Sequence, residues 1–342
     1  MLFETLKTLC AINGTSGRED AVREKILEMI DGCCDEVKVD AMGNIIAFKK
    51  GAKPRAKKVM LDAHMDEVGF MVTGYTDDGM LRFQSVGGII PTAIIGRSVS
   101  VGEKGYIGVI GTKPIHLQSA EERSTVVPAD KLYFDIGAEN KEDVQKYVEL
   151  GEAAYFVSEY REFGNDMVKA KAIDDRIGCA VMVELIRGEL EYDTWFSFSV
   201  QEEVGCRGAI GATFTVQPDY AICIEGTTAG DVTGVTGDKR VCCVGGGAVV
   251  SFMDNGTIYD RKLYQYARSV ADELGIPNQT KTMVAGGNNS GKIHVTAGGV
   301  RTVAVSVPTR YIHSPSCVAK KSDMQAVCDL VKALNDRLGV EE

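Results

Sequence analysis

The chain has 342 residues, of which 44% are hydrophobic and 25% charged, with a formal net charge of −10. This composition is typical of a globular protein, and the acidic balance argues against a nucleic acid as partner, because that partner requires a basic surface. No apolar run approaches the roughly 20 residues of a membrane span, so no membrane partner is expected. The cysteines form no C-x-x-C pair and the start of the chain lacks a secretory signal, so we expect free thiols and a cytoplasmic protein.

The first 70 residues predict a helix, a hairpin and then a buried strand. Ser16 and Glu19 have the spacing of a capping box, which predicts a helix that begins after Ser16. A strand ends near Asp40, a tight turn follows, and the next strand leads into a lysine-rich loop over 51–58. The apolar run after this loop ends at His64.

From residue 71 to 163 the pattern changes to short alternating runs separated by many glycines. This spacing is typical of a small antiparallel barrel and not of βαβ units. The polar stretch 117–125 is predicted to be an exposed loop, and one helix over about 141–150 closes the section. We therefore predict that 71–163 form a domain inserted into a catalytic domain made of 1–70 and 164–342.

After residue 163, buried strands again alternate with helices. The periodicity predicts helices over 176–187 and 258–274, and a last helix from Ser322, where Gln325 completes a second capping box. The predicted fold class is α/β: a discontinuous α/β/α catalytic domain with a mixed, largely parallel sheet, plus an inserted small β-barrel.

Carboxylates and histidines stand where successive apolar runs stop. These residues are His64, Asp66, Glu67, Asp174, Asp175, Glu202, Glu203, Glu225 and His313. Such short apolar runs are typical of strands buried on both faces, and ligands of open α/β sheets collect at the carboxyl ends of the strands. Two histidines with several carboxylates suit a divalent metal such as zinc or its neighbours.

Two histidines and three carboxylates are enough for a site with two ions if one carboxylate bridges them. Asp174 is the best bridge, because it is short and stands where a strand turns into a helix. Asp175 stands beside it at the same helix N-terminus, which favours negative charge. Asp66 follows His64 by two residues and can accept the spare ring N–H of that histidine, which would fix its tautomer.

Glu202 and Glu203 are adjacent, so their side chains point in different directions. One of them can bind a metal ion while the other acts as the general base. The expected reaction is hydrolysis, in which a metal-bound hydroxide attacks a carbonyl. His116 and His294 are assigned to no metal, and His294, in a glycine-rich turn region, stays a candidate for the wall of a pocket.

Several other catalytic motifs are absent. The sequence has no Walker lysine motif, no G-x-S-x-G elbow and no H-E-x-x-H pattern. Two adjacent glutamates also cannot straddle a sugar bond at the separation of about 5 Å or more that glycosidases need. Nucleotide binding, a helix-borne mononuclear zinc site and glycoside hydrolysis are therefore not expected.

The chain resembles the dinuclear metallo-aminopeptidases that build large tetrahedral particles, also called glutamyl or deblocking aminopeptidases and, in older usage, endoglucanases. The segments that carry the resemblance are AHMDEVGF (63–70), IIGRSVSV (94–101), GVIGTKPIHL (108–117), AIDDRIG (172–178), VQEEVGCRGA (200–209), CIEGTTAGDVTG (223–234) and RYIHSP (310–315). They cover nearly the whole chain in order, and together they are specific.

The resemblance implies a role for each site residue. His64 and Glu225 bind one metal, Glu203 and His313 bind the other, Asp174 bridges the two, and Glu202 is the catalytic base. The implied cofactors are two divalent ions per subunit, zinc first, with cobalt or manganese as alternatives. The implied substrates are short peptides trimmed from a free N-terminus, and the insert resembles a dimerisation domain whose dimers assemble into a homododecamer.

Two positions depart from the usual pattern of these enzymes. Many members have Asp at the position of Glu225, and GGNNSG (286–291) replaces a GGTDAG-like stretch, so no preference for one N-terminal residue is carried over. Two alternatives stay open: a carboxypeptidase or deacylase on the same dinuclear scaffold, and a non-catalytic assembly protein. Retention of all five ligand candidates together with Glu202 argues against the second.

Overall fold

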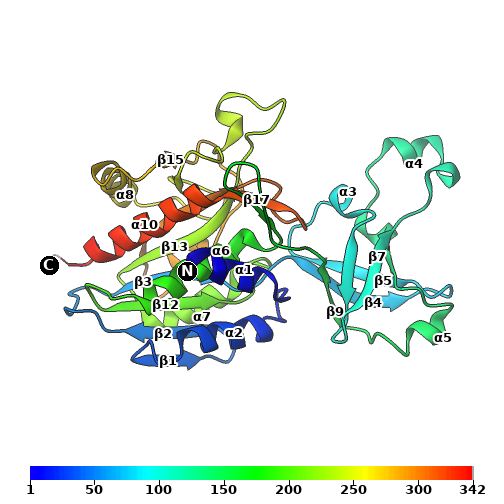
Figure 1. Ribbon diagram of the computed structural model, residues 1–342, viewed down its shortest axis with the longest axis horizontal. Coiled ribbons are helices and arrows are strands. Elements are labelled where there is room, and N and C mark those ends of the chain that lie inside the picture. Colours follow the sequence, from blue (N-terminus) through cyan, green and yellow to red (C-terminus); the bar gives the residue numbers. More distant parts are fainter. Residues whose placement is uncertain (341–342) are drawn as a thin grey trace.

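The computed structural model describes residues 1–340, which form a large lobe and a smaller lobe that projects from one end of it, away from the C-terminus (Figure 1). The large lobe is built on an eight-stranded sheet and the small lobe is a closed barrel of six strands. No helix in this range is long and apolar enough to cross a membrane. The cysteines in the same range are free thiols.

The eight-stranded sheet is mixed, with a parallel centre. Its strands, in spatial order, are β1 (Glu36–Val39), β2 (Ile45–Lys49), β12 (Thr194–Ser199), β3 (Val59–His64), β13 (Tyr220–Thr228), β16 (Arg301–Thr309), β14 (Ala248–Val250) and β15 (Asn278–Thr280). The four central strands β12, β3, β13 and β16 run parallel to one another, whereas β1 with β2, β2 with β12, and β14 with β16 are antiparallel. This architecture confirms the predicted α/β class and largely parallel sheet.

Helices cover both faces of this sheet. Successive side chains of a strand point to opposite faces, so strands that are apolar throughout need a covering layer on each side. The helices are α1 (Leu2–Cys10), α2 (Asp20–Ile30), α6 (Ile173–Arg187), α7 (Arg207–Val216), α8 (Arg261–Glu273), α9 (Ser290–Ile293) and α10 (Lys321–Arg337). On one face Leu61 and Ala63 belong to the core cluster formed with α1, α2, α6, α8 and α10. On the other face Met60 clusters with α7 and α9. The large lobe therefore has the predicted α/β/α layers.

The small lobe is an antiparallel barrel with an aromatic core. Its strands are β4 (Gly69–Tyr75), β5 (Leu81–Val86), β6 (Ser98–Val101), β7 (Tyr106–Gly111), β8 (Tyr133–Asp135) and β9 (Ala153–Phe156), joined by α3 (Pro91–Ile94), η1 (Ile115–Leu117), α4 (Ala120–Ser124), η2 (Ala129–Lys131) and α5 (Lys141–Val144). Phe83 and Phe134 stack at 4.2 Å between ring centroids, and Phe70 packs edge-on against both. The predicted β-barrel is confirmed.

The two lobes are joined through a small antiparallel sheet. It contains β10 (Arg161–Phe163), β11 (Met167–Ala170) and β17 (Cys317–Lys320). The limits that we predicted for the inserted domain, 71 and 163, stay a prediction.

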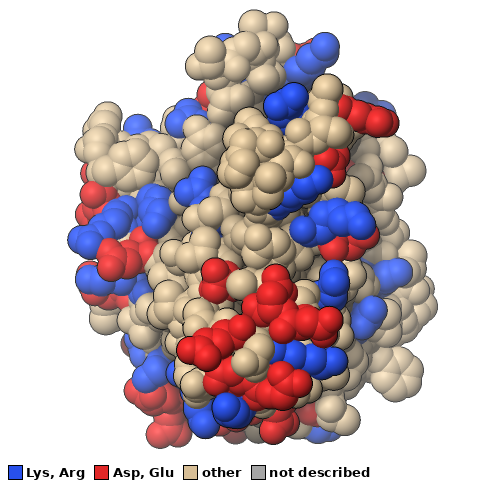
Figure 2. All heavy atoms as spheres, turned by 90° about the vertical axis from the view of Figure 1, so that its right-hand side faces the viewer, with Lys and Arg blue, Asp and Glu red and all other residues tan. Residues whose placement is uncertain are grey.

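Figure 2 views the molecule from the barrel end and shows acidic side chains gathered over the lower part of this face, so the negative charge is unevenly distributed over it.

Four local predictions were wrong. Ser16 does not cap a helix, because α2 begins at Asp20 and Ser16 binds the carboxylate of Asp66 instead. The last helix begins at Lys321 without a side-chain cap. A capping box does form at Ser119 and Glu122, in the stretch predicted as a loop, where it starts α4. The helix predicted over 141–150 ends at Val144.

Candidate metal centre

The candidate ligands come from five segments that meet at one edge of the central sheet. His64 is the last residue of β3, Glu225 lies in the second half of β13, and Glu203 follows β12. Asp174 lies at the start of α6, and His313 lies in the loop between β16 and β17. Because β12, β3, β13 and β16 are parallel neighbours, their carboxyl ends open on the same side, where ligands of α/β sheets bind.

Asp174 stands between two groups of potential ligands. Its Oδ1 is 3.6 Å from Nε2 of His64, and its Oδ2 is 3.5 Å from Nε2 of His313. Nε2 of His64 is also 3.7 Å from Oε2 of Glu225, and Nε2 of His313 is 3.3 Å from Oε2 of Glu203. The trios His64–Asp174–Glu225 and Asp174–Glu203–His313 thus share only Asp174.

These distances fit metal ligands. The ligand atoms of a tetrahedral zinc ion, at bonds of about 2.0–2.1 Å, lie about 3.3 Å from one another. The observed separations of 3.3–3.7 Å are close to that value and longer than ordinary hydrogen bonds. Imidazole nitrogen and carboxylate oxygen are also the donor types that zinc, cobalt and manganese accept. The residues present therefore fit two divalent ions with Asp174 between them.

The electrostatics of the cluster point the same way. Burial raises the pKa of Glu202 to about 8, and it also raises the pKa values of Glu203 and Glu225. Burial alone would lower the pKa of His313, but the facing carboxylates of Asp174 and Glu203 raise it to about 11. Buried carboxylates at this density require positive charge, which divalent cations would supply.

Glu202 belongs to neither trio around Asp174. Its Oε2 is 3.9 Å from Nε2 of His64, and its Oε1 is 3.3 Å from the thiol sulfur of Cys206, which can donate a hydrogen bond. One carboxylate oxygen thus faces the ligand cluster while the other is held by a neighbour. Sequence reasoning missed Cys206, since a thiol within a loop gives no signal of what it contacts.

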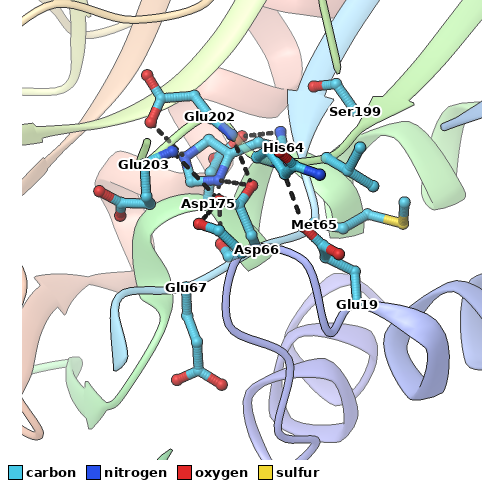
Figure 3. A network of polar contacts seen from close by, with 12 residues as sticks. Glu19, His64, Met65, Asp66, Glu67, Asp175, Ser199, Glu202 and Glu203 are labelled. Atoms are coloured by element: carbon cyan, nitrogen blue, oxygen red, sulfur yellow. Dashed lines mark hydrogen bonds and ion pairs between the residues drawn. The ribbon is translucent and has the colours of Figure 1, made fainter. Parts of the chain in front are cut away.

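Asp66 fixes the geometry of several site residues (Figure 3). The Nδ1 atom of His64 is 3.0 Å from the backbone carbonyl of Asp66 and 3.4 Å from its carboxylate. The same carboxylate accepts hydrogen bonds from the backbone N–H groups of Glu202 (3.0 Å) and Glu203 (3.1 Å), and from the hydroxyl of Ser16 (2.6 Å). Asp66 therefore holds the glutamate pair as well as the histidine.

Asp175 links the start of α6 to the end of β3. Its carboxylate accepts hydrogen bonds from the backbone N–H groups of His64 (3.3 Å) and Gly178 (3.0 Å), and its side chain is fully buried. The ring of His313 is oriented from the other lobe, because its Nδ1 is 2.9 Å from the backbone carbonyl of Gly88, which follows β5. Both histidines thus leave Nε2 facing Asp174.

Glu67, which the strand-end pattern grouped with His64 and Asp66, points away from the cluster in Figure 3. Its carboxylate forms buried ion pairs with Lys171 and Arg176 and accepts a hydrogen bond from the backbone N–H of Gly14. Glu67 therefore stabilises the packing of the segments next to the site and faces no candidate ligand. The pattern could not separate it from the ligands, because its partners lie far away in the sequence.

Asn289, in the departing GGNNSG stretch, acts as a hydrogen-bond donor. Its side-chain amide donates to the carboxylate of Asp62 (2.7 Å) and to the hydroxyl of Ser199 (2.8 Å), and its backbone N–H faces Glu225 at 3.4 Å. An ionised aspartate at this position could not donate to Asp62. The asparagine at position 289 is thus suited to the buried carboxylate of Asp62, which accepts its hydrogen bond.

The cluster opens into a cavity of about 600 Å³. Its wall includes the carboxylates Asp174, Glu202, Glu203 and Glu225, with His313, Cys206, Asn288, Lys281 and Lys292. His294 is not among the lining residues; its Nδ1 is 2.7 Å from the carbonyl of Ser290, and its contribution to a pocket stays a prediction. His116 is exposed in the small lobe, away from the cluster.

Comparison with known proteins gives consistent matches. Residues 43–330 match the family described as M42 glutamyl aminopeptidase. A putative aminopeptidase of Acetivibrio thermocellus is 41% identical over 97% of this chain and 98% of its own, and the lysyl aminopeptidase of Pyrococcus furiosus is 33% identical over 98% and 97%. The TET1 peptidase of Pyrococcus horikoshii, which can assemble into a tetrahedron or a large octahedral shell, superposes with a TM-score of 0.86 at 36% identity, covering 99% of this chain and 100% of that one.

Proposed function

Because the chain belongs to the M42 glutamyl aminopeptidase family and is a metal-dependent aminopeptidase, we propose that it removes N-terminal residues from short peptides with two divalent ions bound around Asp174. His64 and Glu225 would hold one ion, His313 and Glu203 the other, and Asp174 both. The observation that carries the proposal is that the two oxygens of Asp174 face different histidines at 3.6 and 3.5 Å. When bound, the ions would supply Lewis acidity, which polarises the peptide carbonyl and acidifies a water.

Glu202 performs the proton transfers in this proposal. It takes a proton from the attacking water as the new C–O bond forms, and it gives that proton to the amine nitrogen as the C–N bond breaks. Its Oε2 faces the ligand cluster, and its backbone is held by Asp66, so the carboxylate is positioned before substrate arrives. The cavity carboxylates also favour a substrate that carries a positively charged terminal amine.

The metal content tests this arrangement. Protein saturated with zinc, cobalt or manganese should hold two ions per chain, and chelation should abolish hydrolysis of amino-acid nitroanilides until metal is restored. Glu225→Ala should hold about one ion, whereas Asp174→Ala should bind both ions poorly, because Asp174 belongs to both trios. Asp77→Ala, at an exposed turn of the barrel, is the control and should retain both. Full activity with a single ion per chain would contradict the dinuclear arrangement.

We further propose that the small lobe pairs with another copy of itself and that the dimers assemble into a dodecamer. The lobe exposes several large apolar side chains, namely Ile90, Ile107, Ile115, Leu117 and Val126. Several large apolar side chains exposed on one lobe favour an interface with another copy.

Light scattering with sedimentation velocity tests this assembly. We expect a species far larger than a monomer at micromolar concentration, and a smaller species for Ile107→Glu and Ile115→Glu, which place charge on the apolar surface. Lys146→Glu, which replaces an exposed charged side chain of the same lobe, is the control for a charge change that removes no apolar side chain. A monomer for the unaltered chain would contradict both dimer and dodecamer.

A further inference from the structure

Asn289 contacts three neighbouring strands of the sheet at the candidate metal centre, and these contacts place one of the candidate ligands. We propose that Asp62 and Asn289 are positioning residues, which together hold Glu225 so that one oxygen of its carboxylate faces the ion. The proposal rests on the proposed function, because it takes Glu225 as a ligand of one ion, and it adds the residues that orient this ligand.

Asp62 and Asn289 meet in the layer between the sheet and α9. Asp62 lies in β3 two residues before His64, so the two side chains point to the same face of the sheet. This face is covered by α9, since Met60 of β3 and Ile293 of α9 belong to one apolar cluster. Asp62 and Asn289 are both fully buried, so their side chains must find partners inside the protein.

The side-chain amide of Asn289 is fixed between two strands. Its nitrogen donates to Oδ2 of Asp62 at 2.7 Å and to the hydroxyl of Ser199, the last residue of β12, at 2.8 Å. These two bonds use both hydrogens of the amide. Because β12 and β3 are adjacent strands at the centre of the sheet, residue 289 is anchored to the most rigid part of the large lobe.

The backbone of Asn289 holds the carboxylate of Glu225. The backbone N–H of Asn289 faces Oε1 of Glu225 at 3.4 Å, and Oε2 of the same carboxylate is 3.7 Å from Nε2 of His64. Within residues 1–340 this N–H is the one hydrogen-bond donor to the Glu225 carboxylate. A glutamate has several rotatable bonds, so its strand does not place the carboxylate by itself. The contact with Asn289 selects the rotamer in which Oε2 faces the ligand cluster.

The pair has a polarity that substitutions can reverse. Asn289 is the donor and Asp62 the acceptor, because an ionised carboxylate has no hydrogen to donate. Asn289→Asp would place two carboxylates against each other and displace residue 289, whereas Asp62→Asn would keep an acceptor for the Asn289 amide. The double variant Asp62→Asn/Asn289→Asp restores one donor and one acceptor with their places exchanged.

A titration of metal-free protein with zinc against a competing chelator measures the Kd of each ion. Asn289→Asp should raise the Kd of one ion by about 10- to 100-fold, the usual effect of altering a residue that holds a metal ligand. Asp62→Asn should change it by less than about threefold, because a hydrogen bond remains. The double variant should return to within about threefold of Asp62→Asn, since its donor and acceptor are paired again.

Two controls show whether the effect acts through Glu225. Glu225→Ala should hold about one ion, and adding Asn289→Asp to it should leave the Kd of that ion unchanged. Asn335→Asp is the matched control for a charge placed at a buried asparagine. Asn335 is fully buried and its amide donates to the hydroxyl of Thr194 at 3.0 Å, at the opposite end of β12 from Ser199. Both ions should be retained in this variant.

The proposal is overturned if Asn289→Asp keeps both ions at unaltered affinity, if the double variant is as weak as Asn289→Asp, or if Asn289→Asp still weakens zinc binding in Glu225→Ala. If Asn289→Asp does not fold, Asn289→Leu, which has a similar shape and no donor, replaces it, and unaltered affinity for both ions again overturns the proposal. The unaltered chain separates the two levels of failure. If it binds two ions and the variants do not differ from it, only the positioning role fails, whereas fewer than two ions contradict the proposed function itself.

Discussion

Glu202→Gln is expected to lower kcat by about 10²–10⁴-fold, the usual effect of losing a general base. The amide has nearly the same shape as the carboxylate but cannot accept a proton from water. The backbone hydrogen bond from Glu202 to Asp66 does not involve the side chain, so the position of residue 202 should persist. Steady-state kinetics with a neutral nitroanilide, together with the metal content of the same preparation, measures both properties.

Glu203→Gln is the matched comparison, because Glu203 is the neighbouring residue and is held by the same Asp66 carboxylate. Its carboxylate lies 3.3 Å from Nε2 of His313, so its replacement should weaken binding of one ion, and excess metal should restore part of the activity. Added metal should not rescue Glu202→Gln. If the two variants exchanged these phenotypes, the roles of the two glutamates would be reversed.

Arg176→Met is expected to destabilise the fold by about 3–5 kcal/mol, the range seen when one partner of a buried ion pair is removed. The guanidinium is fully buried and donates hydrogen bonds to the carbonyls of Met65 (2.8 Å), Leu9 (2.6 Å) and Ile12 (3.1 Å). It also lies 3.6 Å from the carboxylate of Glu67. Methionine leaves these carbonyls without their donor, and a buried acceptor without a partner is costly.

Urea denaturation at one fixed protein concentration measures this loss, since assembly would make the midpoint concentration-dependent. Arg187→Met is the control on the same helix: its guanidinium donates one exposed hydrogen bond to Met29, so the expected change is within about 0.5 kcal/mol. Equal effects of the two substitutions would show that the buried arginine contributes no more than an exposed one.

The site was best predicted from the sequence where a potential metal ligand stands at the end of a predicted strand. His64 and Glu225 each lie at or near the end of an apolar run, and parallel pairing then brings those ends together whatever the lengths of the loops between them. The α/β/α layers of the large lobe were also predicted correctly, because buried strands alternate with helices along the sequence. The predicted roles of the site residues remain predictions until the variants are measured.

Local signals failed where tertiary partners decide the outcome. Ser16 and Glu19 have the spacing of a capping box, but Asp66 offers the hydroxyl of Ser16 a buried charged acceptor, which is a stronger partner than a helix N–H. By its position in the sequence Glu67 resembles a metal ligand. Its carboxylate instead pairs with Lys171, which lies more than a hundred residues away.

The carbonyl of Gly88 gives the small lobe a part in the chemistry. It lies 2.9 Å from Nδ1 of His313, so a residue that belongs to the barrel's side of the molecule sets the tautomer of a ring on the catalytic side. A large lobe without the barrel would keep the strands and loops that carry the candidate ligands. The imidazole of His313, however, would be free to rotate and to exchange its proton between its two nitrogens. The barrel is therefore a structural part of the candidate metal centre, and we expect a chain without it to lose the fixed orientation of His313.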